Sequence, residues 1–317
     1  MWYDKKPAIT WKQLPADLMM QRLTVPEGVI DMVLDTDTYN EVDDQFALAY
    51  ALLSPERLNV EAVYAAPFFN DRSNGPEQGM ERSYDEILRL LEKLHHSSEN
   101  FAFRGSPRYM DAAKTPIESD AVRDLIARAM ARPMDRPLYV VAIGAITNVA
   151  SAILLEPAIT EKIVLVWLGG QPSTYTNTNE FNLSQDPYAA QVIFDCGVPL
   201  MRVPCMGVSS HMLTSIPELQ YCLGGKNALC DMLLDIVRGY PQDDFAWGKE
   251  IWDVSTIGFL MNPDWVPTKL VHSPILTDDY FWAHDERRHF NREAYFCSRN
   301  PIFKDLFRKL AAFQDER

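Results

Sequence analysis

The sequence has little positive charge for its size. Its 317 residues include 30 Lys and Arg against 44 Asp and Glu, which gives a formal net charge of −14. Proteins that hold nucleic acid or an anionic membrane do so mainly through clustered basic side chains. Neither is therefore an expected partner, and a small neutral or cationic molecule or a metal ion suits this charge better.

The sequence also lacks paired cysteines and long hydrophobic runs. None of its five cysteines forms a C-x-x-C pair, so we expect buried reduced thiols and not a zinc or redox site. No segment has the roughly 18–20 consecutive apolar residues that cross a bilayer. The first twenty residues lack the continuous apolar region of a secretory signal, and we expect a cytoplasmic protein.

What the chain does contain is a regular alternation of short apolar runs with longer amphipathic segments. Runs rich in Val, Ile and Leu are typical of strands buried on both faces, and their alternation with helices predicts repeated βα units. The expected fold is a single α/β domain over residues 1–317, with a mostly parallel sheet flanked by helices. Strands are predicted at residues 30–35, 58–65, 138–143, 163–168, 200–203 and 269–272, with a late strand within 287–296. Helices are predicted at residues 44–53, 78–94, 120–131, 148–155, 188–196, 227–238, 254–260 and 301–313.

An acidic cluster follows the first predicted strand, in IDMVLDTDTYNEVDDQ. Asp35 ends the strand, Asp37 comes two residues later, and a helix begins near Asp43 and Asp44. Each of these acids alone is well explained as a helix cap or a solvent-facing residue. Together they would repel one another unless a cation neutralises them or some are protonated, and hard cations such as calcium and magnesium prefer oxygen ligands. Because the carboxyl ends of parallel strands carry the sites of such sheets, the cluster predicts a divalent metal site there.

Three further segments place polar residues at predicted strand ends or helix starts. In VVAIGAITNV a buried strand turns into a helix at Thr147. In NEFN, Glu180 and Asn182 flank an apolar residue, which would put both on one side of an extended backbone. In EIWDVSTIGFL, Asp253 opens an apolar helix directly after Trp252. Taken singly, each is an ordinary turn, cap or packing residue.

In their order and local context, the four segments resemble those of the inosine-uridine-preferring nucleoside hydrolase family. The resemblance spans about residues 28–265. It implies that calcium is held by Asp37, Asp44, Asp253 and the backbone carbonyl of Thr147, while Asp43 activates a metal-bound water. The expected partner is a small nucleoside or a related ribosyl compound, and we also expect a homo-oligomer.

The resemblance also implies how a nucleoside is held. Glu180 and Asn182 would hydrogen-bond the ribose. Members that prefer inosine and uridine carry His immediately before the late ligand Asp, whereas this chain has Trp252, as in the purine-specific branch. There, stacking on tryptophan is thought to ease protonation of the purine. The residues that could cover the other face of the base are Phe68, Phe69, Trp247 and Trp282.

The acidic motif departs from the family pattern in its length. The family usually has three residues between the ligand Asp and the Asp pair, and this chain has five, residues 38–42. This leaves open whether Asn40 or Glu41 enters the site. Asp35 is a further candidate for the metal site or its immediate surroundings.

The function we predict is calcium-dependent hydrolysis of the N-glycosidic bond of ribonucleosides, with a preference for purines, releasing the base and ribose. Carboxylates near the ring would stabilise the oxocarbenium-like transition state. One alternative is a haloacid-dehalogenase-like phosphohydrolase, because residues 35–38 resemble its D-x-D-x-T motif with Asp35 as nucleophile and Asp37 as acid. It gives the E-F-N and W-D segments no role. A second alternative is a catalytically silent nucleoside- or sugar-binding protein, against which the presence of Asp43 argues.

Overall fold

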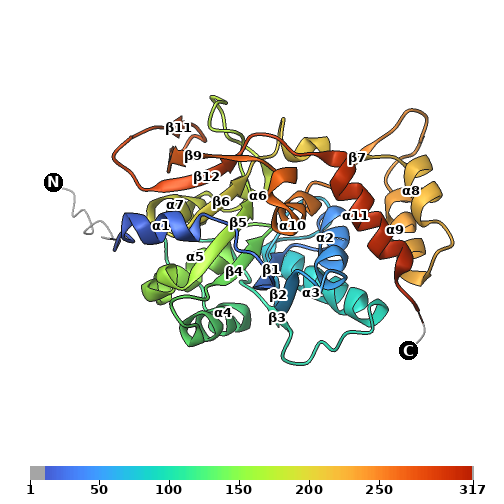
Figure 1. Cartoon of the computed structure of the whole chain (residues 1–317), viewed down its shortest axis with the longest axis horizontal. Helices are drawn as coiled ribbons and strands as arrows, with labels where there is room; N and C mark the ends of the chain where they lie inside the picture. Colours follow the sequence, from blue (N-terminus) through green and yellow to red (C-terminus); the bar gives the residue numbers. More distant parts are fainter. Residues whose placement is uncertain (1–10, 316–317) are drawn as a thin grey trace.

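An eight-stranded sheet runs through the molecule with the strand order β3-β2-β1-β4-β5-β6-β12-β9 (Figure 1). The computed structural model describes residues 11–315. Every neighbouring pair in the sheet is parallel except β12 and β9. The strands are β1 (Ile30–Thr36), β2 (Leu58–Ala65), β3 (Ala102–Arg104), β4 (Leu138–Ala142), β5 (Ile163–Leu168), β6 (Leu200–Val203), β9 (Thr268–His272) and β12 (Phe290–Ala294).

Helices cover both faces of the sheet. Successive side chains of a strand point to opposite faces, so the apolar strands supply one core on each side. Met32 and Leu34 of β1 enter one apolar core, and Val33 between them enters the other. The first core includes residues of α2 (Asp43–Leu52), α3 (Pro76–Lys93), α9 (Ala228–Arg238), α10 (Val254–Met261) and α11 (Arg299–Ala312). The second includes residues of α4 (Asp120–Ala131), α5 (Thr147–Leu155) and α7 (Pro187–Asp195).

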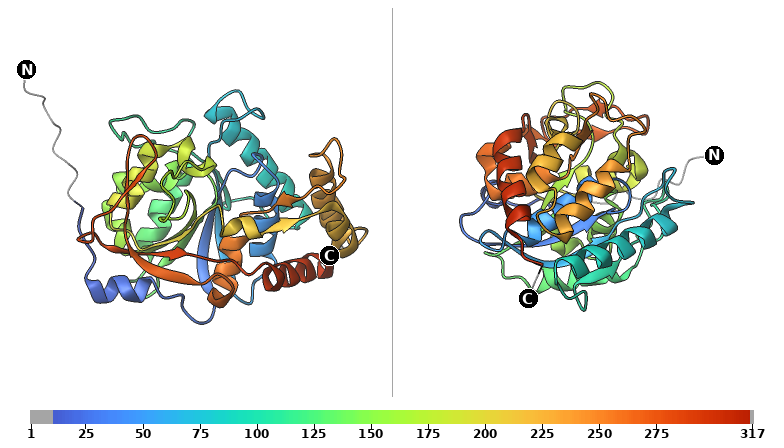
Figure 2. Two further views of the ribbon diagram at one scale, coloured as in Figure 1. Left: turned by 90° about the horizontal axis from the view of Figure 1, so that it is seen from above. Right: turned by 90° about the vertical axis from the view of Figure 1, so that its right-hand side faces the viewer.

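The remaining elements lie at the ends and rims of the molecule. Helices α1 (Ala16–Arg22) and α11 lie at opposite ends in two of the views, and α11 packs there with α8 (Ile216–Leu223) and α9 (Figures 1 and 2). A short helix α6 (Phe181–Gln185) precedes α7. Two small hairpins complete the fold: β7 (Leu213–Thr214) with β8 (Lys249–Glu250), and β10 (Ile275–Leu276) with β11 (Trp282–Ala283).

The order of the strands in the sheet places a crevice beside β1. From β1 the chain builds β2 and β3 outward on one side, then returns to lay β4 against the other side of β1 and continues with β5 and β6. Loops that leave β1 and β4 therefore diverge at the carboxyl ends of these strands, where sheets of this kind bind ligands. The first of these loops carries the acidic motif.

The predicted fold class, a mostly parallel sheet flanked by helices, is confirmed. The predicted bounds of β2, β5, β6 and α4 coincide with those observed, and most other predicted elements differ by one or two residues at an end. Helices α1, α6 and α8, strand β3 and the two hairpins were not predicted. These elements have two to eight residues each, too few to show a clear hydrophobic period.

Three observations concern the expected compartment. Within residues 11–315, no helix is both long and apolar enough to cross a membrane. The expected absence of a secretory signal concerns in part residues 1–10, which lie outside the described residues. The five cysteines are unpaired; three are buried as expected, while Cys205 and Cys222 are only partly so.

Candidate active site

The segment from the end of β1 to the first turn of α2 carries three acids of the predicted site. Asp37 follows β1, and its carbonyl accepts a hydrogen bond from the amide of Asn40 at 2.7 Å. Asp43 and Asp44 are the first two residues of α2 and are buried. The residue before the helix is Val42, so neither acid acts as its cap. Helix capping, the simpler explanation for Asp43, is therefore wrong.

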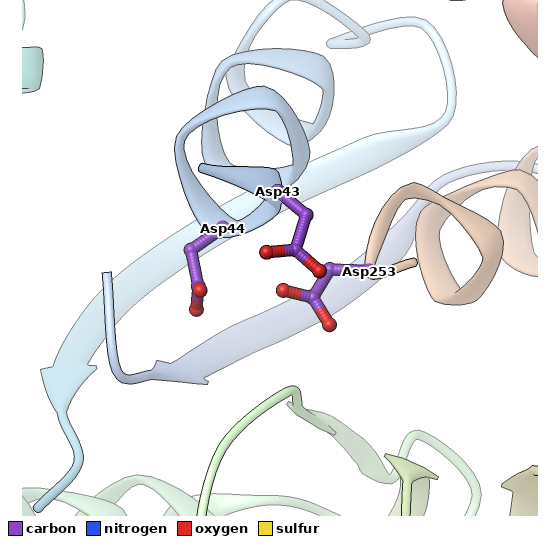
Figure 3. A group of neighbouring side chains, drawn as sticks. All are labelled: Asp43, Asp44 and Asp253. Carbon is purple, nitrogen blue, oxygen red and sulfur yellow. The ribbon is translucent and has the colours of Figure 1, made fainter. Parts of the chain in front are cut away.

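Asp253 reaches the same place from the start of α10, which packs against α2. Its backbone is already helical, and its side chain makes no capping hydrogen bond. Instead the carboxylates of Asp43, Asp44 and Asp253 point toward one another (Figure 3). They offer oxygen atoms that all lie within 4.8 Å of one another, and the three residues could hold a metal ion.

Asp37 completes the acidic cluster from β1. Its side chain is 1% exposed, and neither carboxylate oxygen has a hydrogen-bond partner within residues 11–315. Gly144, which follows β4, makes room for it: a Cβ on Gly144 would lie 3.0 Å from the Asp37 carboxylate carbon. Burying polar atoms without hydrogen-bond partners costs free energy of folding. Both Asp37 oxygens are therefore suited to act as ligands of a cation.

The electrostatics of the cluster also fit a cation. Burial raises the pKa of Asp37, Asp43 and Asp253 well above the usual range, and the charges of neighbouring acids raise them further. Burial likewise raises the pKa of Asp44 to about 6, against the lowering effect of a hydrogen bond from Thr36. A divalent cation with oxygen ligands would remove this repulsion and let all four acids ionise.

The cluster forms one wall of a cavity of about 260 Å³. Most of the predicted site residues line it, although they come from separate parts of the chain. Those that do are Asp37, Asn40, Glu41, Asp43, Asp44, Glu180, Asn182, Trp252 and Asp253. The structure thus brings together nine of the eleven candidates.

Thr147 and Asp35 do not line this cavity. Thr147 is the first residue of α5, and its hydroxyl donates to a carboxylate oxygen of Asp186 at 2.7 Å. The role of its carbonyl as a metal ligand stays a prediction. Asp35 accepts a hydrogen bond from Asn148 at 2.7 Å, and burial raises its pKa to about 7. It therefore lies in the layer that supports the acidic turn.

The longer acidic motif brings both of its undecided residues to the cavity. The Asn40 side-chain oxygen accepts a hydrogen bond from the Asn70 amide at 2.6 Å. The Glu41 carboxylate forms an ion pair with Lys249 of β8, four residues before Asp253. The inserted residues thus contact both the loop after β2 and the segment that carries the last acid.

Glu180 reaches the cavity for a different reason from the one expected. Glu180 itself is extended, but the next residues already belong to α6, so the extended backbone on which the alternation depended is not present. The Glu180 carboxylate caps α6 by accepting from the amides of Asn182 at 2.9 Å and Leu183 at 3.1 Å. It also accepts from the Gly170 amide at 2.7 Å. Burial raises its pKa, and these three donors act in the opposite direction.

Asn182 bridges two strand ends. Its side-chain nitrogen donates to the carbonyls of Ile143, after β4, at 3.1 Å and of Leu168, at the end of β5, at 3.0 Å. These two bonds fix the amide plane. The side-chain oxygen has no hydrogen-bond partner among the described residues and is the atom left to accept from a ligand.

Sequence reasoning missed part of the cavity lining, namely Phe181, Cys205 and Met206. Gln171, on the loop that follows β5, also lines the cavity, as loops at the carboxyl ends of parallel strands do. None of the four aromatic residues proposed to face Trp252 lines the cavity. Phe68, for example, is fully buried in the protein. The aromatic residue that does share the cavity with Trp252 is Phe181.

Comparisons with known proteins agree with this geometry. Residues 32–289 match the family model described as inosine-uridine preferring nucleoside hydrolase. The chain is 30% identical over 169 residues to the pyrimidine-specific ribonucleoside hydrolase RihB of Escherichia coli K12, an alignment that covers 51% of this chain and 53% of that protein. It is 28% identical to the putative RihB of Shigella boydii serotype 4, where 69% of the relative is covered. The chain thus spans about half to two thirds of the length of these curated relatives.

Solved structures show the same fold. A purine-preferring ribonucleoside hydrolase from Gardnerella vaginalis superposes with a TM-score of 0.72 at 19% identity, covering 89% of this chain and 98% of the other. A plant nucleoside hydrolase, PpNRh1, gives 0.70 at 19% identity, with 90% and 99% covered. The family match favours the predicted hydrolase over the phosphohydrolase alternative. With most of its length matched, the chain belongs to the inosine-uridine preferring nucleoside hydrolase family of enzymes.

Proposed function

We propose that this chain hydrolyses the N-glycosidic bond of ribonucleosides with calcium as its metal, releasing the free base and ribose. The observation that carries the proposal is the group of four buried acids around the cavity, in which both oxygens of Asp37 lack partners. Family membership supplies the reaction class. A cytoplasmic location, a homo-oligomer and a single catalytic domain over residues 1–317 stay predictions.

The metal would be held by carboxylate oxygens of Asp37, Asp44 and Asp253, together with the carbonyl of Thr147. Calcium takes six to eight oxygen ligands, so this set leaves positions for water and for sugar hydroxyls. When bound, calcium supplies positive charge that orients the sugar hydroxyls and makes water more acidic.

The other residues of the cavity would act on the sugar. Asp43 removes a proton from the attacking water as a general base. The free side-chain oxygen of Asn182 accepts a hydrogen bond from a ribose hydroxyl, and Glu180 accepts another. As the base departs and positive charge develops on the ribose ring, the fixed carboxylates of the cavity stabilise that charge.

The function is tested by incubating the protein with inosine, adenosine, guanosine, uridine and cytidine and measuring free base and ribose. We expect turnover with calcium, loss of turnover after removal of the metal by a chelator, and recovery when calcium is added back. Nucleoside binding without product would instead favour the silent binding protein. Phosphate release from a phosphate ester, with no ribose from any nucleoside, would favour the phosphohydrolase.

We further propose that the enzyme prefers purine ribonucleosides. The named relatives include both a pyrimidine-specific and a purine-preferring enzyme, so the preference must come from this chain's own cavity. Trp252 lines that cavity directly before Asp253. An indole nitrogen donates a hydrogen bond but is no general acid near neutral pH, so stacking is the assistance that Trp252 can give to the leaving base.

Trp252→Ala should lower kcat for inosine by about two- to tenfold, because a lost aromatic stack costs roughly 0.5–1.5 kcal/mol. Wild-type kcat/KM should be higher for inosine than for uridine, since a purine offers the larger face. Trp252→His tests whether a residue that can donate a proton shifts the preference toward uridine. A matched control is Trp265→Ala, which removes a partly buried tryptophan of the same core outside the cavity. An unchanged kcat for inosine in Trp252→Ala, or faster wild-type cleavage of uridine, would refute stacking.

A further inference from the structure

An enclosed ion pair joins two neighbouring parallel strands close to the cavity. Arg202 of β6 and Glu293 of β12 are paired in register and bonded through their side chains. The side chains are 2% and 1% exposed. Enclosing two charges costs so much hydration that well-packed apolar residues are often at least as stabilising. The stability of the sheet alone therefore does not explain the pair, whose Glu293 carboxylate also lies 3.5 Å from the Lys269 ammonium.

Both partners of this ion pair hold the loop that connects β5 to α6, residues 169–180, here called the β5–α6 loop. The Arg202 guanidinium donates to the Gln171 carbonyl at 2.7 Å. The Glu293 carboxylate accepts from the Ser173 amide at 3.2 Å and from the Ser173 hydroxyl at 2.8 Å. The two charges thus direct their remaining hydrogen bonds to the same short stretch of backbone.

The β10–β11 hairpin holds the same loop from another side. The Trp282 indole donates to the Gln171 carbonyl at 3.3 Å, and the Arg202 guanidinium lies 5.0 Å from the centre of its ring. Farther along the loop, the Thr178 amide donates to the Tyr280 carbonyl at 2.8 Å. The loop is therefore fixed near its start and near its end, with Arg202 at the centre of the first attachment.

The residues on this loop reach the cavity. Gln171 lines it, and its side-chain oxygen accepts from the amide of Met206, another lining residue, at 3.0 Å. The preceding residue, Gly170, donates its amide to the Glu180 carboxylate. Gly170 has a φ of +70°, and a Cβ there would lie 2.9 Å from side-chain atoms of Leu183 and Thr178. A displacement of Gln171 would consequently disturb the carboxylate of Glu180.

We propose that Arg202 and Glu293 are positioning residues for the substrate, because their ion pair holds the β5–α6 loop in the conformation that presents Gln171 and Glu180 to the sugar. This rests on the proposed function, in which Glu180 contacts the ribose. Neither residue of the pair lines the cavity, so both act through the loop. Asp37 follows β1, Asp43 and Asp44 begin α2, and Asp253 precedes α10, so the four acids stand outside the β5–α6 loop.

The test is the double variant Arg202→Met with Glu293→Leu, which replaces the pair by apolar side chains. We expect the amides of the β5–α6 loop to exchange hydrogen at least about tenfold faster than in wild type, since the loop loses its attachment. We expect KM for the nucleoside to rise by about 10- to 100-fold, the range for misplaced binding groups, with a smaller change in kcat. Calcium affinity should stay within about twofold of wild type because no metal ligand is moved.

The matched control is Arg132→Met, which breaks an ion pair with Asp31, at the start of β1, and with Glu61. It should leave KM and the exchange of the β5–α6 loop unchanged. If the double variant does not fold, Glu293→Gln is measured in the same way. Wild-type exchange and KM in the variant, or equal effects in Arg132→Met, would overturn the proposal. If wild type cleaves no nucleoside, the proposed function fails, and loop exchange alone then decides whether the pair positions the loop.

Discussion

Asp43→Asn lowers kcat for nucleoside hydrolysis by about 10²- to 10⁴-fold, the usual contribution of a general base. Asparagine keeps the size and polarity of the side chain in this buried position at the start of α2, but it cannot accept the proton of the attacking water. Turnover is measured with saturating calcium, and binding of nucleoside and of calcium is measured separately. Both kinds of binding should persist.

The sharpest control is the same substitution one residue along the helix, Asp44→Asn. Because Asp44 is a proposed ligand and Asp43 is not, Asp44→Asn should weaken calcium binding while Asp43→Asn should not. The comparison is demanding, since carboxylate oxygens of both residues lie within 4.8 Å of one another and of Asp253. Wild-type turnover in folded Asp43→Asn would remove its role as the base. Loss of calcium binding in that variant would make Asp43 a ligand instead.

Asp253→Ala and Asp44→Ala abolish the stabilisation of the protein by calcium. A ligand that binds only the native state, present at 100 times its Kd, adds about 2.7 kcal/mol to the free energy of unfolding. For wild type, whose 317 residues set the entropy of unfolding, this corresponds to an increase in Tm of about 4 °C, which a chelator reverses. Each variant lacks one of the proposed ligands, so its Tm should change little when calcium is added.

The control for this experiment is an acid outside the cluster. Asp264 is exposed and lies just after α10, so Asp264→Ala should keep the full response to calcium. Melting curves of metal-free wild type and of the three variants, with and without calcium, give the comparison. If calcium still raises the Tm of both Asp253→Ala and Asp44→Ala as in wild type, the proposed ligand set is wrong. A wild-type Tm that responds to neither calcium nor chelator would refute the calcium site itself.

The central part of the fold could be predicted because its signals are local. Strands buried on both faces, such as β5, consist of uninterrupted apolar residues. Helix α4 begins after Ser119, whose hydroxyl accepts a hydrogen bond from the Val122 amide, as an N-cap does. The acids of the site could also be named, because the motif and the order of the segments identify them. The hairpins β7–β8 and β10–β11 have two residues in each strand and give no comparable signal.

What the sequence could not supply depends on contacts between distant segments. Asp253 has the local context of an ordinary cap, and only the packing of α10 against α2 turns its side chain toward Asp43. Glu180 does act as a cap, of α6, but it also lines the cavity. Its local sequence does not show this second position. Arg202 and Glu293 lie 91 residues apart, and no spacing or motif links them. Such residues are found from the three-dimensional arrangement alone.

The distribution of the four acids along the chain has a consequence for the order of events during synthesis. Asp37, Asp43 and Asp44 leave the ribosome early, while Asp253 follows only after β2 to β8 have been made. A nascent chain that ends before α10 therefore carries the first three acids without the last one. Because domains are made from the N-terminus onward, metal binding at the complete cluster cannot guide the early steps of folding. A metal at the complete cluster would stabilise the native state only after α10 has packed against α2. It would not direct the earlier steps by which that state forms.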